Sequence, residues 1–217
     1  MVPKKDLFIA GIPLGLMISE AEEYKNNICY SWSKPSGDQN LHEGICFLEN
    51  DLSGATAVRN HLEKKCSSLA IPERAAFEIT LICDELVSNA IVATHEKGSR
   101  ENVLFRWRLN NSTFCFCIID HGGGFDIPRA MSLVPKANSF TDFIEQLKEY
   151  RKNSTVKIKN HGRDVEHTRF GRGLKIVKGL VASLKVTYHD SDGKTRDSLS
   201  ENVVGSIITA TYNINSQ

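Results

Sequence analysis

Residues 71–98 have the periodicity of one long amphipathic helix. Glu85 and Asn89 are four residues apart in this stretch, so a carboxylate and a carboxamide lie one turn apart on one helix face. The carboxamide could hold a hydrated magnesium ion, and the carboxylate could orient or deprotonate an attacking group. The same pair also fits two solvated helix residues. Apolar residues recur at helical spacing and are expected to face a core: Ile79, Ile82, Leu86, Ala90 and Ala93.

A second motif, D-x-G-x-G, stands at the end of an apolar strand. Asp120 closes the stretch 113–120, and Gly122 and Gly124 follow it. Glycines let the backbone approach a flat ligand that a Cβ would exclude. An aspartate at a strand end can accept a hydrogen bond from an exocyclic amino group such as that of adenine. Alone, the motif fits a glycine-rich turn with an incidental aspartate equally well.

A third motif, G-x-G, runs directly into a predicted helix. Its glycines are Gly171 and Gly173, with Arg169 just before them. Free amides at a helix N-terminus after flexible glycines can bind phosphate, although a lone G-x-G is more often an ordinary loop. The helix is expected to carry an apolar stripe made of Leu174, Val177, Leu180, Val181 and Leu184.

The rest of the chain predicts a mixture of strands and helices. Residues 34–40 are predicted to form a loop or boundary, and residues 190–202 a polar loop. Residues 125–168 look like a long excursion with a helix at 140–150, and excursions of this length are often functional lids. Strands are expected at 44–48, 102–109, 113–120, 185–189 and 203–212, a turn at 110–111, and a further helix at 51–67.

Composition narrows the function classes. The 217 residues are 41% hydrophobic and 24% charged, which is ordinary for a globular protein with one substantial core. The net charge of +1 and the lack of a long basic run give no reason to expect nucleic acid or membrane as a partner. An apolar stretch at residues 7–18 is too short to span a bilayer, so a cytoplasmic location is expected. The six cysteines lack C-x-x-C spacing, which predicts reduced thiols.

Taken together and in this order, the three motifs resemble the ATP-binding domain shared by DNA gyrase, histidine kinases, heat-shock chaperones and mismatch-repair ATPases, the GHKL or Bergerat fold. Within that superfamily the chain is most similar to the stand-alone anti-sigma-factor serine kinases of bacteria. The resemblance covers about residues 43–214 and divides the chain into an N-terminal extension of unknown role, 1–42, and an ATPase domain, 43–217. It implies an α/β (α+β) two-layer sandwich, in which helices cover one face of a mixed, mostly antiparallel sheet. ATP would sit between the helices and a lid at about 125–168.

The resemblance also implies a role for each motif residue. Glu85 would be the general base that activates a serine hydroxyl or a water, and Asn89 would ligate Mg²⁺. Asp120 would bind the adenine amino group in a pocket shaped by Gly122 and Gly124.

At the phosphate end, the resemblance implies contacts from the G-x-G box. Gly171 and Gly173 would bind the triphosphate through their amides, and Arg169 would reach the γ-phosphate. Arg172 and Leu174 complete this nucleotide-binding box. Ser206, next to Gly205, matches a small pair that lines the adenine side.

The implied function is a cytoplasmic serine/threonine protein kinase that uses ATP and Mg²⁺. Its partners would be a sigma factor and a small antagonist protein that it phosphorylates, and it would form a homodimer. A non-catalytic, ATP-gated interaction module and an ATPase remain as alternatives. A histidine-kinase-type subunit is disfavoured, because those enzymes typically carry Asn at the position of Glu85. Ala93 departs from the serine kinases, which often have His there.

Overall fold

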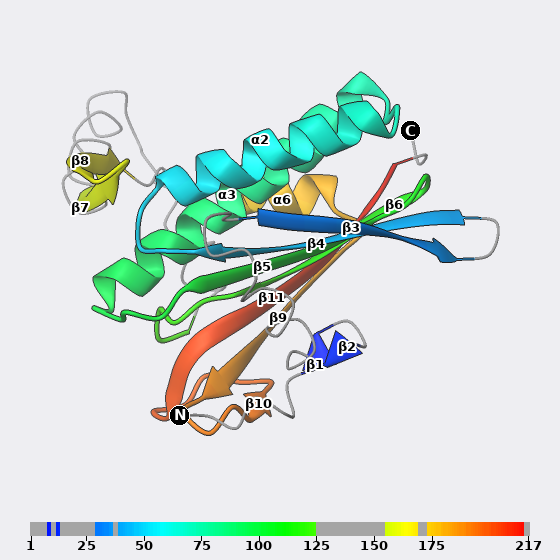
Figure 1. Ribbon diagram of the computed structural model, residues 1–217. Helices are drawn as coiled ribbons and strands as arrows, with labels where there is room; N and C mark the ends of the chain where they lie inside the picture. Colours follow the sequence, from blue (N-terminus) through cyan, green and yellow to red (C-terminus); the bar gives the residue numbers. More distant parts are fainter. Residues whose placement is uncertain are drawn as a thin grey trace, which may run out of the picture.

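The computed structural model describes residues 8–9, 12–13, 29–36, 39–124, 155–168 and 173–214, with backbone only for those before residue 41. Its main feature is a seven-stranded sheet in the order β10-β9-β11-β6-β5-β4-β3, in which every pairing is antiparallel. Figure 1 shows the helices gathered on one face of this sheet. The predicted two-layer sandwich is therefore confirmed. The strands are β3 (Cys29–Ser36), β4 (Gln39–Leu48), β5 (Val103–Leu109), β6 (Thr113–Ile119), β9 (Ser183–Asp190), β10 (Thr195–Arg196) and β11 (Val203–Asn213).

Three helices form the second layer: α2 (Ser53–Ser68), α3 (Glu73–Glu96) and α6 (Gly173–Leu180). The predicted apolar positions of α3 are buried, Ile79 and Ile82 completely, apart from the half-buried Ala93. The helix-facing side of β5 is Val103, Phe105, Trp107 and Leu109, as its alternation predicts, and all four are in the core. Pro72 occupies the N-cap position of α3.

The predicted loop at 34–40 is wrong. Only residues 37 and 38 lie between β3 and β4, which pair from Ser36 opposite Gln39 to Cys29 opposite Cys46. Pro35 lies in β3, the outer strand of the sheet, where a missing amide hydrogen is tolerated. Strand β4 runs across the predicted boundary at residue 42, and the division into two domains stays a prediction.

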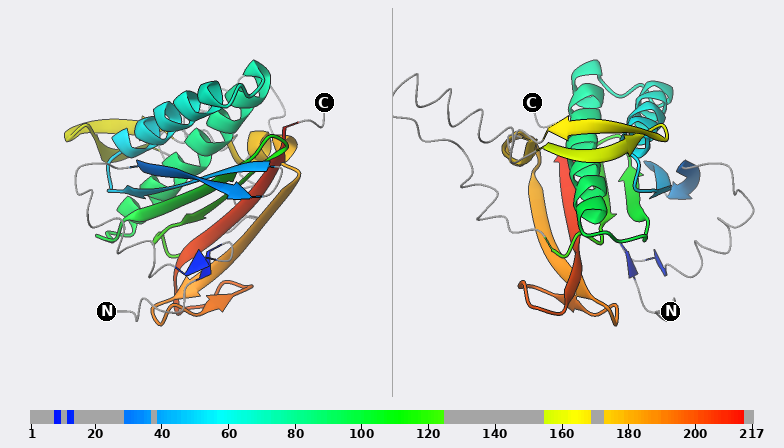
Figure 2. Two further views of the ribbon diagram at one scale, coloured as in Figure 1. Left: turned by 45° about the vertical axis from the view of Figure 1, so that its right-hand side comes forward. Right: turned by 90° about the vertical axis from the view of Figure 1, so that its left-hand side faces the viewer.

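The excursion contains a hairpin that was not predicted. β7 (Thr155–Asn160) and β8 (Arg163–Thr168) pair through a turn in which His161 and Gly162 both have positive φ, as a type I′ turn requires. Figure 2 shows the hairpin beside the ends of α2 and α3. The predicted helix at 140–150 lies outside the described residues.

Three smaller expectations also need correction. α6 ends at Leu180, because the chain turns there to begin β9 at Ser183, so Leu184 belongs to a strand and not to the helical stripe. The predicted loop at 190–202 includes the short strand β10. Cys46 is disulfide-bonded, so the expectation of reduced thiols is wrong for this residue. Four other cysteines are free: Cys66, Cys83, Cys115 and Cys117.

A short two-stranded sheet, β1 (Phe8–Ile9) with β2 (Ile12–Pro13), precedes the main one. None of the helices in the described part of the chain has the length and apolar character that crossing a membrane would need.

Candidate functional site

Glu85 meets the start of α6. A Cβ placed on Gly173, the first residue of that helix, would overlap Oε2 of Glu85 and lie 2.8 Å from its Cδ. Leu174 and Val177 of α6 are buried in the core and fix the helix against α3. Burial, with a smaller contribution from the neighbouring Asp84, raises the pKa of Glu85. The two motif residues therefore come together as a carboxylate against the N-terminus of a helix.

Asp120 is the second centre of the site. It follows β6 and is only 3% exposed. Its Oδ1 accepts the amide hydrogens of Gly122 at 2.8 Å and Ser206 at 3.3 Å. Burial raises the pKa of Asp120, although these two hydrogen bonds and the nearby His189 act in the opposite direction. The side chain is thus a fixed, nearly water-free hydrogen-bonding group.

The glycines of the D-x-G-x-G turn allow close packing on both sides. A Cβ on Gly122 would lie 2.5 Å from Cβ of Ala93 on α3. Gly124 has φ of +96°, which disfavours any other residue, and a Cβ there would overlap Leu199. The amide of His121 donates to Oγ1 of the buried Thr94 at 3.1 Å, which ties the turn to α3 a second time.

One stripe of α3 connects the two centres. Glu85 contacts Gly173, Ala93 contacts Gly122, and Asn89 lies midway between them. The eight residue steps from Glu85 to Ala93 span about 12 Å along a helix axis. An elongated ligand lying along α3 would therefore meet Asp120, which can accept hydrogen bonds from an amino group, at one end. At the other end it would meet the Glu85 carboxylate and the amides at the start of α6.

Ser206 tests whether this site suits a nucleotide base. Its side chain is completely buried and close enough to Asp120 to lower the pKa of that carboxylate, but among the described residues Oγ makes no hydrogen bond of normal geometry. A buried hydroxyl without a partner is costly unless a ligand or water completes it. Since its amide already contacts Asp120, the pair offers an acceptor and a hydroxyl to a ring edge, which fits adenine.

A comparison with known protein families identifies the family of the chain. A family model described as a histidine kinase-like ATPase domain matches residues 48–197. The chain belongs to this family. The GHKL assignment made from the three motifs is therefore confirmed, and membership implies a kinase or ATPase that binds ATP.

Two other comparisons add little. No match is found among curated proteins. A solved structure, the crystal structure of the SiaB-SiaC complex from Pseudomonas aeruginosa, contains a chain that is similar with a TM-score of 0.41 and 13% identity, over 91% of this chain and 98% of that chain. A TM-score of this size supports no inference about function.

Some predicted site residues of this histidine kinase-like ATPase domain cannot be placed. Arg169, Gly171 and Arg172 lie outside the described residues, as does the stretch 125–154. Strand β11 has a bulge just before the Gly205–Ser206 pair. The β11–β9 register shifts between Val203 and Gly205.

Sequence reasoning missed two residues that support Asp120. His189 is buried, and because a carbonyl can only accept, its Nε2 donates to the main-chain oxygen of Asp120 at 2.8 Å. Gly205 makes this contact possible, since a Cβ there would overlap that oxygen. Thr94 is the other. In the sequence, Thr94 is recognisable only as a hydroxyl on the buried face of a helix. His189 is recognisable only by its place at the end of a strand.

Proposed function

We propose that the protein is an ATP-dependent serine/threonine protein kinase of the anti-sigma type, which phosphorylates a small antagonist protein and also binds a sigma factor. The contact between Glu85 and Gly173 supports the proposal most, because the terminal phosphate of a nucleotide held by Asp120 and lying along α3 would end near this carboxylate. The proposal includes action in the cytoplasm and as a homodimer, as the sequence resemblance implies.

The proposed chemistry is a single phosphoryl transfer. A serine hydroxyl of the substrate protein attacks the γ-phosphorus, and the hydroxyl proton goes to Glu85. The bond between the γ-phosphorus and the bridging oxygen breaks, and ADP leaves with that oxygen. Burial favours this role, since a raised pKa makes the Glu85 carboxylate a stronger base. Asn89 would hold the Mg²⁺ that accompanies ATP, which neutralises charge on the phosphates.

The test combines transfer and binding. Purified protein with ATP and Mg²⁺ should label a serine or threonine on an antagonist protein encoded beside it. Glu85→Ala should reduce transfer by at least 100-fold and leave ATP affinity within about threefold, because the general base does not hold the nucleotide. Asp120→Asn should weaken binding about tenfold or more, because a buried carboxylate that accepts hydrogen bonds is replaced by an amide.

Asp84→Asn is the matched control. This carboxylate is next to Glu85 in sequence but points to Arg59 of α2, 3.5 Å away, and its removal should change transfer by less than fivefold. Equal losses of ATP affinity in the Glu85 and Asp120 variants would refute the roles assigned here. ATP binding without transfer to any co-encoded antagonist would favour the ATP-gated interaction module instead.

A further inference from the structure

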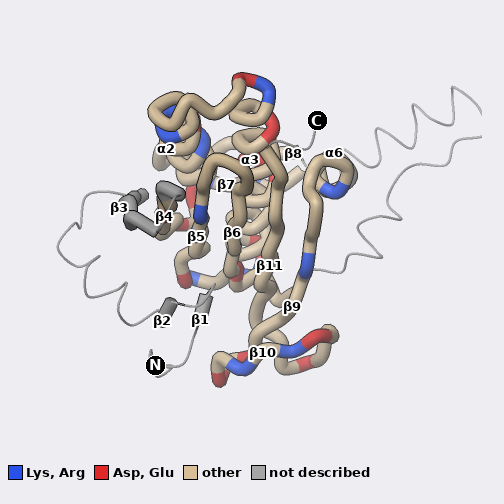
Figure 3. The backbone as a smooth tube through the Cα atoms, turned by 90° about the vertical axis from the view of Figure 1, so that its right-hand side faces the viewer, with Lys and Arg blue, Asp and Glu red and all other residues tan. Residues whose placement is uncertain are grey.

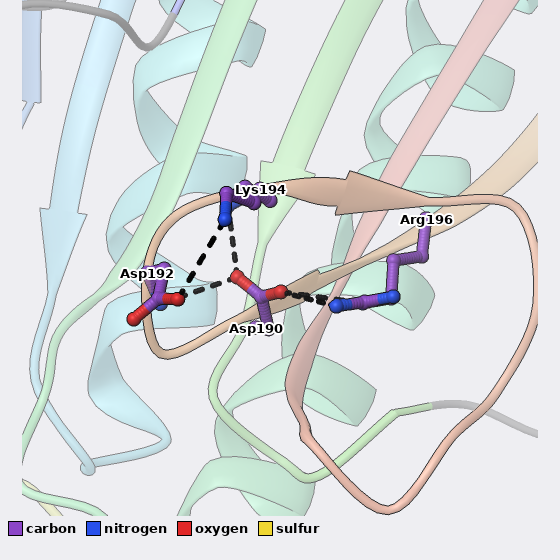
Figure 4. A network of polar contacts seen from close by, with 4 residues as sticks. All are labelled: Asp190, Asp192, Lys194 and Arg196. Carbon is purple, nitrogen blue, oxygen red and sulfur yellow. Dashed lines mark hydrogen bonds and ion pairs between the residues drawn. The ribbon is translucent and has the colours of Figure 1, made fainter.

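The loop between β9 and β11 is organised around one buried carboxylate. Asp190, 5% exposed, ends β9, and its Oδ1 accepts the amide hydrogens of Asp192 at 3.2 Å and Lys194 at 2.9 Å. Its Oδ2 accepts hydrogen bonds from Nε and Nη2 of Arg196 at 3.2 Å and 2.9 Å. Figure 4 shows these contacts from both sides of the carboxylate. Acidic and basic residues lie close together along this loop, as Figure 3 shows.

The far part of the loop touches the D-x-G-x-G turn. Leu199 is 44% exposed, yet its Cδ2 occupies the space that a Cβ of Gly124 would need, and Cγ1 of Val203 would lie 3.0 Å from the same point. The amide of Gly123 donates to the Val204 carbonyl at 2.9 Å. The left-handed turn is therefore supported from outside by the end of the loop.

His189, the residue before Asp190, supports the same motif directly, because it donates a hydrogen bond to the main-chain oxygen of Asp120. Consecutive residues of β9 thus reach the motif by two routes, His189 directly and Asp190 through the loop. No other ion pair among the described residues links the loop to a buried carboxylate, since the remaining ones, Lys185–Asp197 and Lys194–Asp192, join exposed side chains at 3.9 Å. The Asp190–Arg196 pair is therefore the side-chain contact that adds to the backbone pairing of β10 with β9 in holding the loop.

We propose that Asp190 and Arg196 are positioning residues for nucleotide binding: their ion pair holds Leu199 and Val203 against Gly124 and keeps the D-x-G-x-G turn in its ligand-binding shape. The inference rests on the ATP binding that the proposed function requires, but not on phosphoryl transfer. Neither residue is expected to touch the phosphates, because the loop meets the site at Gly124 and not at Gly173.

The effect of losing Arg196 should therefore have a distinct pattern. In Arg196→Ala the loop keeps its backbone pairing with β9 but loses the side-chain contact with Asp190, so the nucleotide must supply more of the ordering of the turn, which raises the dissociation constant. ATP and ADP should both bind about tenfold more weakly, because they share the adenosine portion that the turn receives. Arg196→Lys should recover part of the loss, since it keeps the charge but not the paired hydrogen bonds.

The experiment is calorimetry with Mg²⁺-ATP and Mg²⁺-ADP on the full chain, with circular dichroism to verify folding. Lys194→Ala is the control: its backbone amide still bonds Asp190, and its side chain reaches only the exposed Asp192, so both affinities should stay within twofold. Leu199→Ala tests the contact between the loop and Gly124, and it should lower the affinities for ATP and for ADP by the same factor.

Two results would overturn the proposal: unchanged affinities in Arg196→Ala, or a loss confined to ATP, which would point to the phosphate end. A wild-type protein that binds neither nucleotide would instead contradict the proposed function.

Discussion

At the scale of single residues, the glycines show most directly how tightly the site is packed. Gly173 and Gly179 belong to the same helix, α6, but their surroundings are opposite. A Cβ on Gly173 would overlap the Glu85 carboxylate, whereas nothing lies within 4 Å of a Cβ on Gly179. The first glycine is required by the site and the second is not.

Alanine at these two positions should separate function from helix propensity. Gly173→Ala should displace Glu85 and reduce phosphoryl transfer by at least 100-fold, because the base loses its position. Gly179→Ala should keep transfer and stabilise the fold by about 0.5–1 kcal/mol, the usual gain from glycine to alanine in a helix. Transfer rates and urea unfolding of both variants test this. Equal activity in the two would mean that Gly173 has no special role.

Much of the site could be predicted at this scale because its chemistry is carried by motif residues. Glu85, Asp120 and Gly173 are recognisable from residue type and spacing. His189 and Leu199 are not, since each acts through a contact that depends on how β9 and β11 pair and bulge. Ala93 was predicted as a core position and as a departure from the serine kinases, but its contact with Gly122 needed the structure.

At the scale of elements, the β7–β8 hairpin is joined to the helix layer through Asp51. The carboxylate accepts the amides of Ser53, His161 and Gly162 at 2.8–2.9 Å, and the Leu52 amide donates to the Lys159 carbonyl at 2.8 Å. Although burial acts to raise it, the Ser53 side chain, followed by these backbone amides, lowers the pKa of Asp51 to about 2. The carboxylate form therefore stabilises the docked hairpin.

Asp51→Asn should destabilise the protein by about 1–2 kcal/mol at neutral pH, since charge-assisted bonds to the hairpin turn are lost. A lowered pKa means that the contribution is complete above the ordinary value of 3.8 and disappears as the pH falls toward 2. The difference between wild type and variant in urea unfolding should thus be constant from pH 5 to 7 and shrink below pH 4. A difference that grows on acidification would contradict this account of Asp51.

The hairpin and the outer strand β3 show why some elements could not be predicted. Pro35 and the residues around it carry turn signals, but an edge strand pairs on one side only and accepts them. The hairpin is short and largely exposed, and it is docked by Asp51, more than 100 residues away in sequence, together with Ile158, which is buried in the core. Long, strongly periodic elements such as α3 and β5 were predictable because their own residues define the buried face.

At the scale of the whole molecule, three half-buried histidines have lowered pKa values. Burial, followed by the Lys65 charge, lowers the pKa of His42 and of His61, where Lys64 adds a smaller effect. Burial and the nearby His189 lower the pKa of His121, against the opposite effect of Glu101. The unfolded chain therefore binds more protons than the folded one just below pH 6.5.

Stability should consequently rise with pH between about 6 and 7.5. The raised pKa values of Glu85 and Asp120 act in the opposite direction at lower pH, so the informative quantity is the difference from a His61→Gln variant. Urea midpoints should increase more steeply with pH for the wild type than for this variant. Parallel slopes would show that His61 contributes nothing to the pH dependence.

The pairing of β6 with β11 has a consequence for how this chain tolerates change. The strand before residues 125–168 is hydrogen-bonded directly to a strand that follows them, so the sheet is complete without the segment between. Each doubling of a flexible connection costs only about 0.6 kcal/mol of closure entropy. Relatives could therefore differ in the number of residues between β6 and the β7–β8 hairpin with little loss of stability, and insertions should accumulate there. The hairpin itself should be kept, because Asp51 and the buried Ile158 hold it.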